Sequence, residues 1–172
     1  MAKVKGLKKI NKIINNFTQT NFNIKAKIGS DFLAFTDKME IRYAVGVDSD
    51  DVKYFITDAI SKYQGIKADP FIWLLLHEIG HCMTNDMFTP DETEYFEQMK
   101  EKLAYIRDDQ DRNDWYHCLP DEFMATGWAA RYMFNHGNKV AKFWNKLQPA
   151  LIQFYMKNGV DIREEGAINE NA

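Results

Sequence analysis

Two histidines stand four residues apart in the segment His77-Glu78-Ile79-Gly80-His81. Residues four apart on a helix lie on the same face, so both imidazole rings can reach one ion. Zinc is commonly held by two imidazoles and a third protein ligand at about 2.0–2.1 Å, with one position left open for water. We therefore predict that His77 and His81 are ligands of a zinc ion.

The acidic residue inside this segment has a chemical role of its own. Zinc lowers the pKa of a bound water towards neutrality and polarises a carbonyl group. Glu78 directly follows the first histidine, close enough to accept the proton of that water and to pass it to a leaving amine. The spacing suits amide hydrolysis, and it predicts Glu78 as the general base.

The third ligand must come from another part of the chain, because no third histidine follows at the spacing HExxHxxGxxH. Glu122 is the best candidate. It shares one helical face with Ala125 and Ala129, whose small side chains would let the two helices pack closely. Asp121 is an alternative ligand, although a carboxylate in the first turn of a helix also complements the helix dipole.

Two further alternatives precede this helix. His117 could replace Glu122 as a ligand, or it could act with Tyr116 as the proton donor that stabilises the oxyanion. We assign it the catalytic role, with an ordinary loop histidine as the competing interpretation. Cys118 could be a soft zinc ligand. These alternatives remain open from the residues alone.

Together the two segments resemble the ImmA/IrrE-type metallopeptidases. The pattern of that group is a HExxH helix followed by E-x-x-A-x-x-F-A on a later helix. This chain has HEIGH at 77–81 and then Glu122, Ala125 and Ala129, with Trp128 in place of the phenylalanine. The resemblance covers these two helices only.

The resemblance implies a minimal gluzincin. In such a site His77, His81 and Glu122 would bind zinc, and Glu78 would be the general base. Some members of the group cleave DNA-binding repressors, so a protein or peptide substrate is implied.

The rest of the pattern predicts the elements that must position these residues. Asp69-Pro70 and Thr89-Pro90 are typical starts of helices, and Arg107–Asn113 is predicted to be a charged loop. Helical periodicity predicts six helices. Their ranges are 4–17, 52–63, 70–83, 90–106, 120–136 and 139–157.

Alternation of apolar and polar residues predicts three strands, at 22–28, 32–35 and 39–45. The short connections between them favour an antiparallel meander. We expect an α+β, zincin-like fold in one domain over residues 1–165, with a disordered tail at 166–172. One strand edge, 32–35 or 39–45, is expected beside the metal to receive an extended substrate.

Composition limits the setting of this domain. The chain has 172 residues, a net charge of −3 and 45% hydrophobic residues, which is typical of a globular protein. The longest apolar run, Phe71–Leu76, is too short to cross a membrane, and the N-terminus lacks an apolar signal region. We expect a cytoplasmic protein with two reduced cysteines, no membrane partner and no nucleic-acid partner. The oligomeric state is not predicted.

Three functions are compatible with these residues. The first is a zinc-dependent endopeptidase acting on a cytoplasmic protein. The second is a catalytically silent binding protein of the phage or mobile-element type that keeps the scaffold. The third is a metal-dependent hydrolase of a non-peptide amide. The intact Glu78 favours the enzymes, because a scaffold that only binds needs no base beside the metal.

Overall fold

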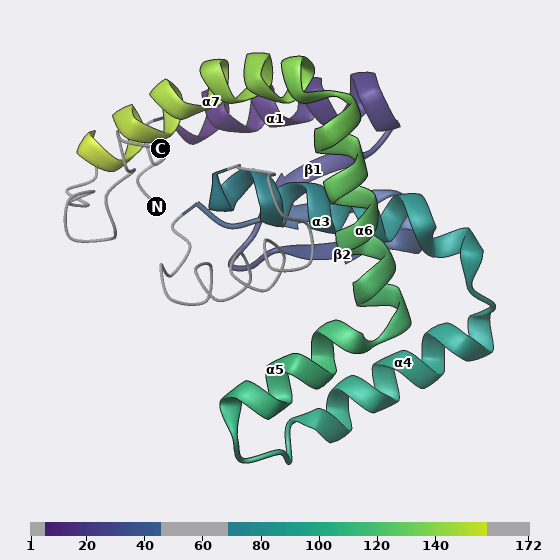
Figure 1. Cartoon of the computed structure of the whole chain (residues 1–172). Helices are drawn as coiled ribbons and strands as arrows, with labels where there is room; N and C mark the ends of the chain where they lie inside the picture. Colours follow the sequence, from purple (N-terminus) through teal and green to yellow (C-terminus); the bar gives the residue numbers. More distant parts are fainter. Residues whose placement is uncertain (1–5, 46–68, 158–172) are drawn as a thin grey trace.

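The computed structural model describes residues 6–45 and 69–157 (Figure 1). Its elements, in chain order, are α1 (Leu7–Phe22), β1 (Lys25–Ile28), β2 (Leu33–Phe35), the 3-10 turn η1 (Thr36–Lys38), β3 (Glu40–Tyr43), α3 (Pro70–Thr84), the 3-10 turn η2 (Asn85–Met87), α4 (Pro90–Leu103), α5 (Asp109–Cys118), α6 (Pro120–Asn135) and α7 (Gly137–Lys157). The expected α+β class is confirmed. The helix predicted at 52–63 and the tail at 166–172 lie outside the described residues, and the domain limits stay a prediction.

The prediction of an all-antiparallel meander is wrong. The sheet has the order β1-β3-β2, in which β1 pairs with β3 in parallel and β2 pairs with β3 antiparallel. Ile28 lies level with Tyr43, and Leu33 lies level with Arg42 on the other side of β3. The short segment between β1 and β2 therefore passes the end of β3, so a short connection does not here mean a hairpin.

A side chain of α1 explains why β1 stays at the outside of the sheet. Asn15 donates a hydrogen bond to the carbonyl of Ala26 at 2.6 Å and accepts one from its N–H at 2.9 Å. Both backbone groups of Ala26 that face away from β3 are thus satisfied by one amide. β3 pairs with β1 through the opposite edge, and the outer edge of β1 is occupied at Ala26.

The helices cover one face of the sheet. Ala26, Ile41 and Tyr43 point to that face and are almost fully buried, whereas Arg42 on the opposite face is exposed. α1 packs on β1, and α3 packs on β2 and β3. α3 is buried on nearly all sides, which agrees with its apolar sequence and makes it the central helix of the core.

A close approach between α3 and α6 brings the two motif segments together (Figure 1). A Cβ atom on Gly80 would lie 2.5 Å from the carbonyl oxygen of Ala125, so only glycine fits at this crossing. Ala125 and Ala129 are fully buried. The prediction that these small residues allow tight packing is confirmed, with Gly80 as the partner on α3.

α4 and α5 form an arm that extends away from the other helices in Figure 1. α4 starts where Thr89-Pro90 predicted a helix start, with a capping box formed by Thr89 and Glu92. The predicted loop at 107–113 is wrong, because α5 begins at Asp109. Asp108 caps that helix by accepting a hydrogen bond from the N–H of Asp111. This N-cap is not evident in the sequence, because several charged residues surround it.

The first helix is also longer than predicted. It continues through the asparagine-rich segment to Phe22 and ends at Asn23, which adopts a left-handed conformation with φ 56°. The asparagine side chains bond within and beyond the helix and do not break it, as Asn15 and Asn21 show. Within the described ranges no helix combines the length and the apolar character needed to cross a membrane.

Candidate metal centre

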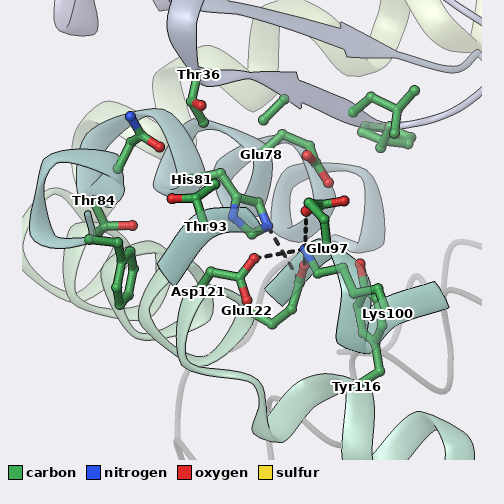
Figure 2. A pocket seen from close by; sticks show the side chains of 15 residues that line it. Thr36, Glu78, His81, Thr84, Thr93, Glu97, Lys100, Tyr116, Asp121 and Glu122 are labelled. Carbon is green, nitrogen blue, oxygen red and sulfur yellow. Dashed lines mark hydrogen bonds and ion pairs between the residues drawn. The ribbon is translucent and has the colours of Figure 1, made fainter. Parts of the chain in front are cut away.

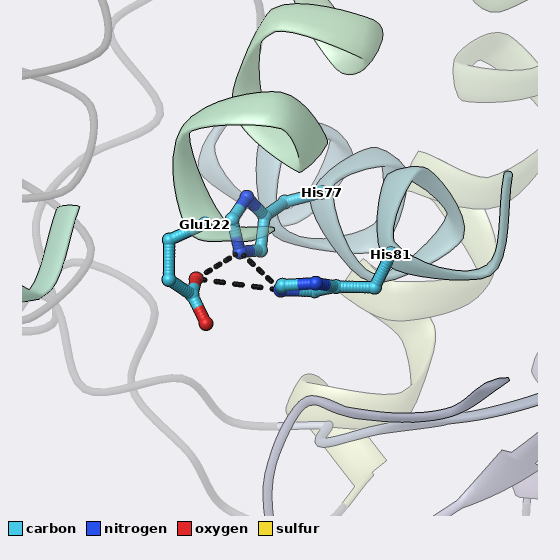
Figure 3. Close-up of side chains that lie close together, drawn as sticks. All are labelled: His77, His81 and Glu122. Carbon is cyan, nitrogen blue, oxygen red and sulfur yellow. Dashed lines mark hydrogen bonds and ion pairs between the residues drawn. The ribbon is translucent and has the colours of Figure 1, made fainter. Parts of the chain in front are cut away.

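Three side chains from α3 and α6 converge on one point (Figure 3). The Nε2 atom of His77 lies 2.9 Å from Oε2 of Glu122 and 3.1 Å from Nε2 of His81, and the last two ligand atoms, Nε2 of His81 and Oε2 of Glu122, are 3.3 Å apart. His77 and Glu122 are buried, and the side chain of His81 is 14% exposed. Among the described residues, this is the group of histidines and acids that can hold a metal ion.

The distances and the donor types fit a zinc ion. A tetrahedral ion with bonds of about 2.0–2.1 Å needs donor–donor separations of about 3.3–3.4 Å. The separation of 3.3 Å between His81 and Glu122 meets that value, and the separations of 3.1 and 2.9 Å from His77 are shorter than it. Two nitrogens and one carboxylate oxygen are also one of the donor sets found in catalytic zinc sites, which leave a fourth position open.

A hydrogen bond on the far side of His77 supports its role as a ligand. Nδ1 of His77 lies 3.1 Å from the hydroxyl oxygen of Thr126, which stands one helical turn after Glu122 on α6. If Nδ1 donates its proton to this hydroxyl, Nε2 keeps a lone pair directed at the centre. Thr126 was missed by sequence reasoning, although its spacing of four residues from Glu122 placed it on the correct face.

The three side chains shift one another's pKa. Burial and the neighbouring His81 lower the pKa of His77, although Glu122 acts in the opposite direction. Burial would lower the pKa of His81 too, but its hydrogen bond to Glu122 and the negative charges of Glu122 and Glu78 together outweigh burial, so the pKa is raised. Burial would raise the pKa of Glu122, but the two histidines hold it well below its usual value. Glu122 is therefore an ionised carboxylate at neutral pH.

Lys100, from α4, contacts the other oxygen of the same carboxylate (Figure 2). Its Nζ atom lies 2.7 Å from Oε1 of Glu122, 2.7 Å from Asp121 and 3.1 Å from Glu97. The side chain of Lys100 is 18% exposed. Burial would lower the pKa of Lys100, but the surrounding carboxylates raise it, so the ammonium group stays charged. No signal in the sequence indicated this residue.

Glu78 lines a cleft of about 260 Å³ together with His81 and Glu122 (Figure 2). β2 contributes Leu33 and Ala34 to one wall of the cleft, and α4 contributes side chains on another. Burial raises the pKa of Glu78 to about 7. A carboxylate with such a pKa can accept and release a proton near neutral pH.

The other sequence candidates take different positions. Asp121 pairs with Lys100 and is not one of the three convergent groups. Cys118 is exposed, and neither it nor the buried Cys82 forms a disulfide. His117 is buried and does not line the cleft, whereas its neighbour Tyr116 does. The catalytic role of His117 stays a prediction.

Comparison of the chain with protein-family models, with curated proteins and with solved structures finds no match. The interpretation of this site therefore depends on its own geometry and chemistry.

Proposed function

We propose that the chain is a zinc-dependent endopeptidase. The observation that carries this proposal is the convergence of His77, His81 and Glu122 beside a cleft that also holds Glu78. When bound there, zinc lowers the pKa of a water molecule and polarises the carbonyl group of a substrate. The remaining steps belong to the side chains of the chain itself.

In this proposal Glu78 accepts a proton as a peptide bond is attacked and donates it to the departing amine. Its pKa of about 7 suits both steps at neutral pH. Tyr116 lines the same cleft, and burial together with the charge of Glu122 raises its pKa, so its hydroxyl stays a proton donor. It is better placed than His117 to stabilise an oxyanion.

The wall formed by β2 favours an extended polypeptide as the substrate. In the described sheet, β2 pairs with β3 on one side and no strand pairs with its outer side. Leu33 and Ala34 from this strand line the cleft. A peptide that adds to this edge would run past Glu78 with its backbone held by hydrogen bonds.

The test separates metal binding from catalysis. Zinc content is measured by mass spectrometry, and hydrolysis is followed with fluorescently labelled unfolded casein alongside small amide substrates. We expect one zinc ion per chain and hydrolysis of the casein. In Glu78→Gln the zinc should be retained while the rate falls by about 10²–10⁴-fold, the usual contribution of a general base.

His81→Ala should lose both the zinc and the hydrolysis, because only two protein ligands remain. Absence of zinc from the wild-type chain contradicts the proposal, and so does an undiminished rate in Glu78→Gln. Cleavage of small amides but not of casein would support the non-peptide hydrolase in place of the endopeptidase.

A further inference from the structure

A second groove lies between α1 and α7, which run side by side in Figure 1. Its volume is about 410 Å³. Its lining residues within the described part of the chain come from these two helices, and the groove is separate from the metal centre, whose ligands come from α3 and α6. The residues of the groove used below are the lysines 12, 139, 142 and 146 and the apolar Ile13, Phe17 and Phe143.

The groove has an unbalanced positive charge. α1 contains three lysines and α7 contains four, and neither helix contains an acidic residue or an arginine. Within 6–45 and 69–157, none of the four groove lysines forms an ion pair, and all four are exposed. The two helices are therefore positively charged, although the net charge of the whole chain is −3.

The rims and the floor of the groove differ in chemistry. Lys139, Lys142 and Lys146 stand three and four residues apart, so they form one row along α7. Between the lysines, Ile13, Phe17 and Phe143 form an apolar floor, and the rings of Phe17 and Phe143 are stacked with centroids 4.0 Å apart. The uncharged polar side chains of Asn16, Thr20 and Asn21 line the rest of the groove on α1.

We propose that this groove binds an acidic helical segment of a partner protein. Carboxylates at positions i, i+3 and i+7 of that segment would face the lysine row on α7, because both helices have the same repeat. One apolar side chain between them would contact the floor beside Phe143. Such helix-in-groove docking combines an apolar anchor with complementary charges at the rim.

A nucleic acid fits the same groove less well. A phosphate backbone gains nothing from an apolar floor, and the groove has neither an arginine for bidentate phosphate contacts nor an exposed aromatic ring for base stacking. Lysine rows alone attract both kinds of polyanion. The apolar floor is therefore the feature that favours a polypeptide.

The test uses two fluorescent 16-residue peptides of the same composition. In the matched peptide, glutamates occupy i, i+3 and i+7 with a leucine at i+4. In the scrambled peptide, the glutamates are spread around the helix. Anisotropy with the full chain in 0.15 M NaCl should show the matched peptide binding about 3- to 150-fold more tightly, because each of the three aligned charge pairs contributes a factor of about 1.4 to 5.

Lys142→Gln should weaken the matched peptide about two- to fivefold, the loss of one such pair. Lys157→Gln is the matched control, because Lys157 is exposed on the same helix outside the groove. Equal binding of both peptides, or equal effects of the two substitutions, overturns the proposal. Tighter binding of a 16-base-pair DNA duplex, lost in Lys142→Gln, overturns it in favour of a nucleic acid. None of these outcomes depends on zinc or hydrolysis.

Discussion

The carboxylate of Glu122 is held from two sides. One oxygen faces both histidines, and the other contacts the ammonium group of Lys100 at 2.7 Å. Lys100 therefore fixes the rotation of this carboxylate and favours binding through a single oxygen. Groups that orient a ligand in this way contribute to metal affinity without touching the metal.

Replacing Lys100 by methionine should raise the zinc dissociation constant about 10- to 100-fold. Removing a positive charge near the site would by itself favour Zn²⁺, so a weaker affinity isolates the loss of orientation. The measurement is a competition titration with a zinc chelator.

Lys102→Met serves as the control for Lys100→Met, since Lys102 is exposed on the same helix. Its dissociation constant should match that of the wild type. An unchanged or tighter zinc affinity in Lys100→Met would show that Lys100 does not orient Glu122.

The sequence was sufficient to identify candidate metal ligands. It was insufficient to identify the residues that orient them. His77 and His81 are recognisable because their spacing matches one helical turn, and Glu122 because small residues share its face. The convergence of these three is what the structure shows. Lys100 reaches the site from α4. The position of this helix depends on tertiary packing, which a local sequence pattern does not predict.

At the scale of elements, the site depends on how closely α3 and α6 cross. Gly80 faces the backbone of Ala125 at this crossing. His77 and His81 flank Gly80 on one helix, and Glu122 lies one turn before Ala125 on the other. The separation of the helix axes therefore sets the separation of the ligands.

Gly80→Ala should destabilise the fold by about 1–3 kcal/mol, the usual cost of forcing an extra carbon into a packed core. It should also weaken zinc binding, because the helices must move apart. Chemical denaturation and the chelator titration measure the two effects.

Gly137→Ala is a matched control, because a Cβ atom there would meet nothing within 4 Å. Alanine at this first residue of α7 should leave zinc affinity unchanged and stability equal or slightly higher. If the two substitutions have the same effect, the close approach at Gly80 is not what positions the ligands.

Helix starts were predictable where capping residues are local, as at Asp69 and Thr89. The order of the strands was not, because it depends on a contact over eleven residues between Asn15 and Ala26. Short connections predicted pairing between neighbours in sequence. Nothing in the sequence around Asn15 distinguishes an asparagine that bonds to β1 from one that ends a helix.

For the molecule as a whole, charge is divided between two regions. The arm at 90–118 has nine acidic and four basic residues, a net charge of −5, whereas α1 and α7 contain lysines and no acid. Because the acidic residues outnumber the basic ones over the whole chain, the net charge alone does not indicate the lysine-rich groove.

Zinc should stabilise the whole fold, because it binds groups that come together only in the folded chain. At free zinc about 100 times the dissociation constant, the gain is about 2.7 kcal/mol, or about 5–10 °C in Tm. Differential scanning fluorimetry with and without zinc at pH 7.5 measures this shift.

The shift in Tm should shrink between pH 7.5 and pH 5.5. The pKa of His81 is raised by Glu122 against the effect of burial, so this ring gains a proton readily as the pH falls. Zinc binds only the neutral ring, so protons compete with it. His81→Ala should show no zinc-dependent shift at any pH, and a shift that grows on acidification would exclude His81 as a ligand.

The amide clamp of Asn15 on Ala26 also decides in which direction this sheet can grow. Because the outward backbone groups of Ala26 are occupied, a foreign strand that joins the described sheet would add more readily beside β2. Self-association through strands and entry to the metal cleft would then compete for the same backbone groups. A ligand seated in the cleft should therefore suppress self-association through this edge.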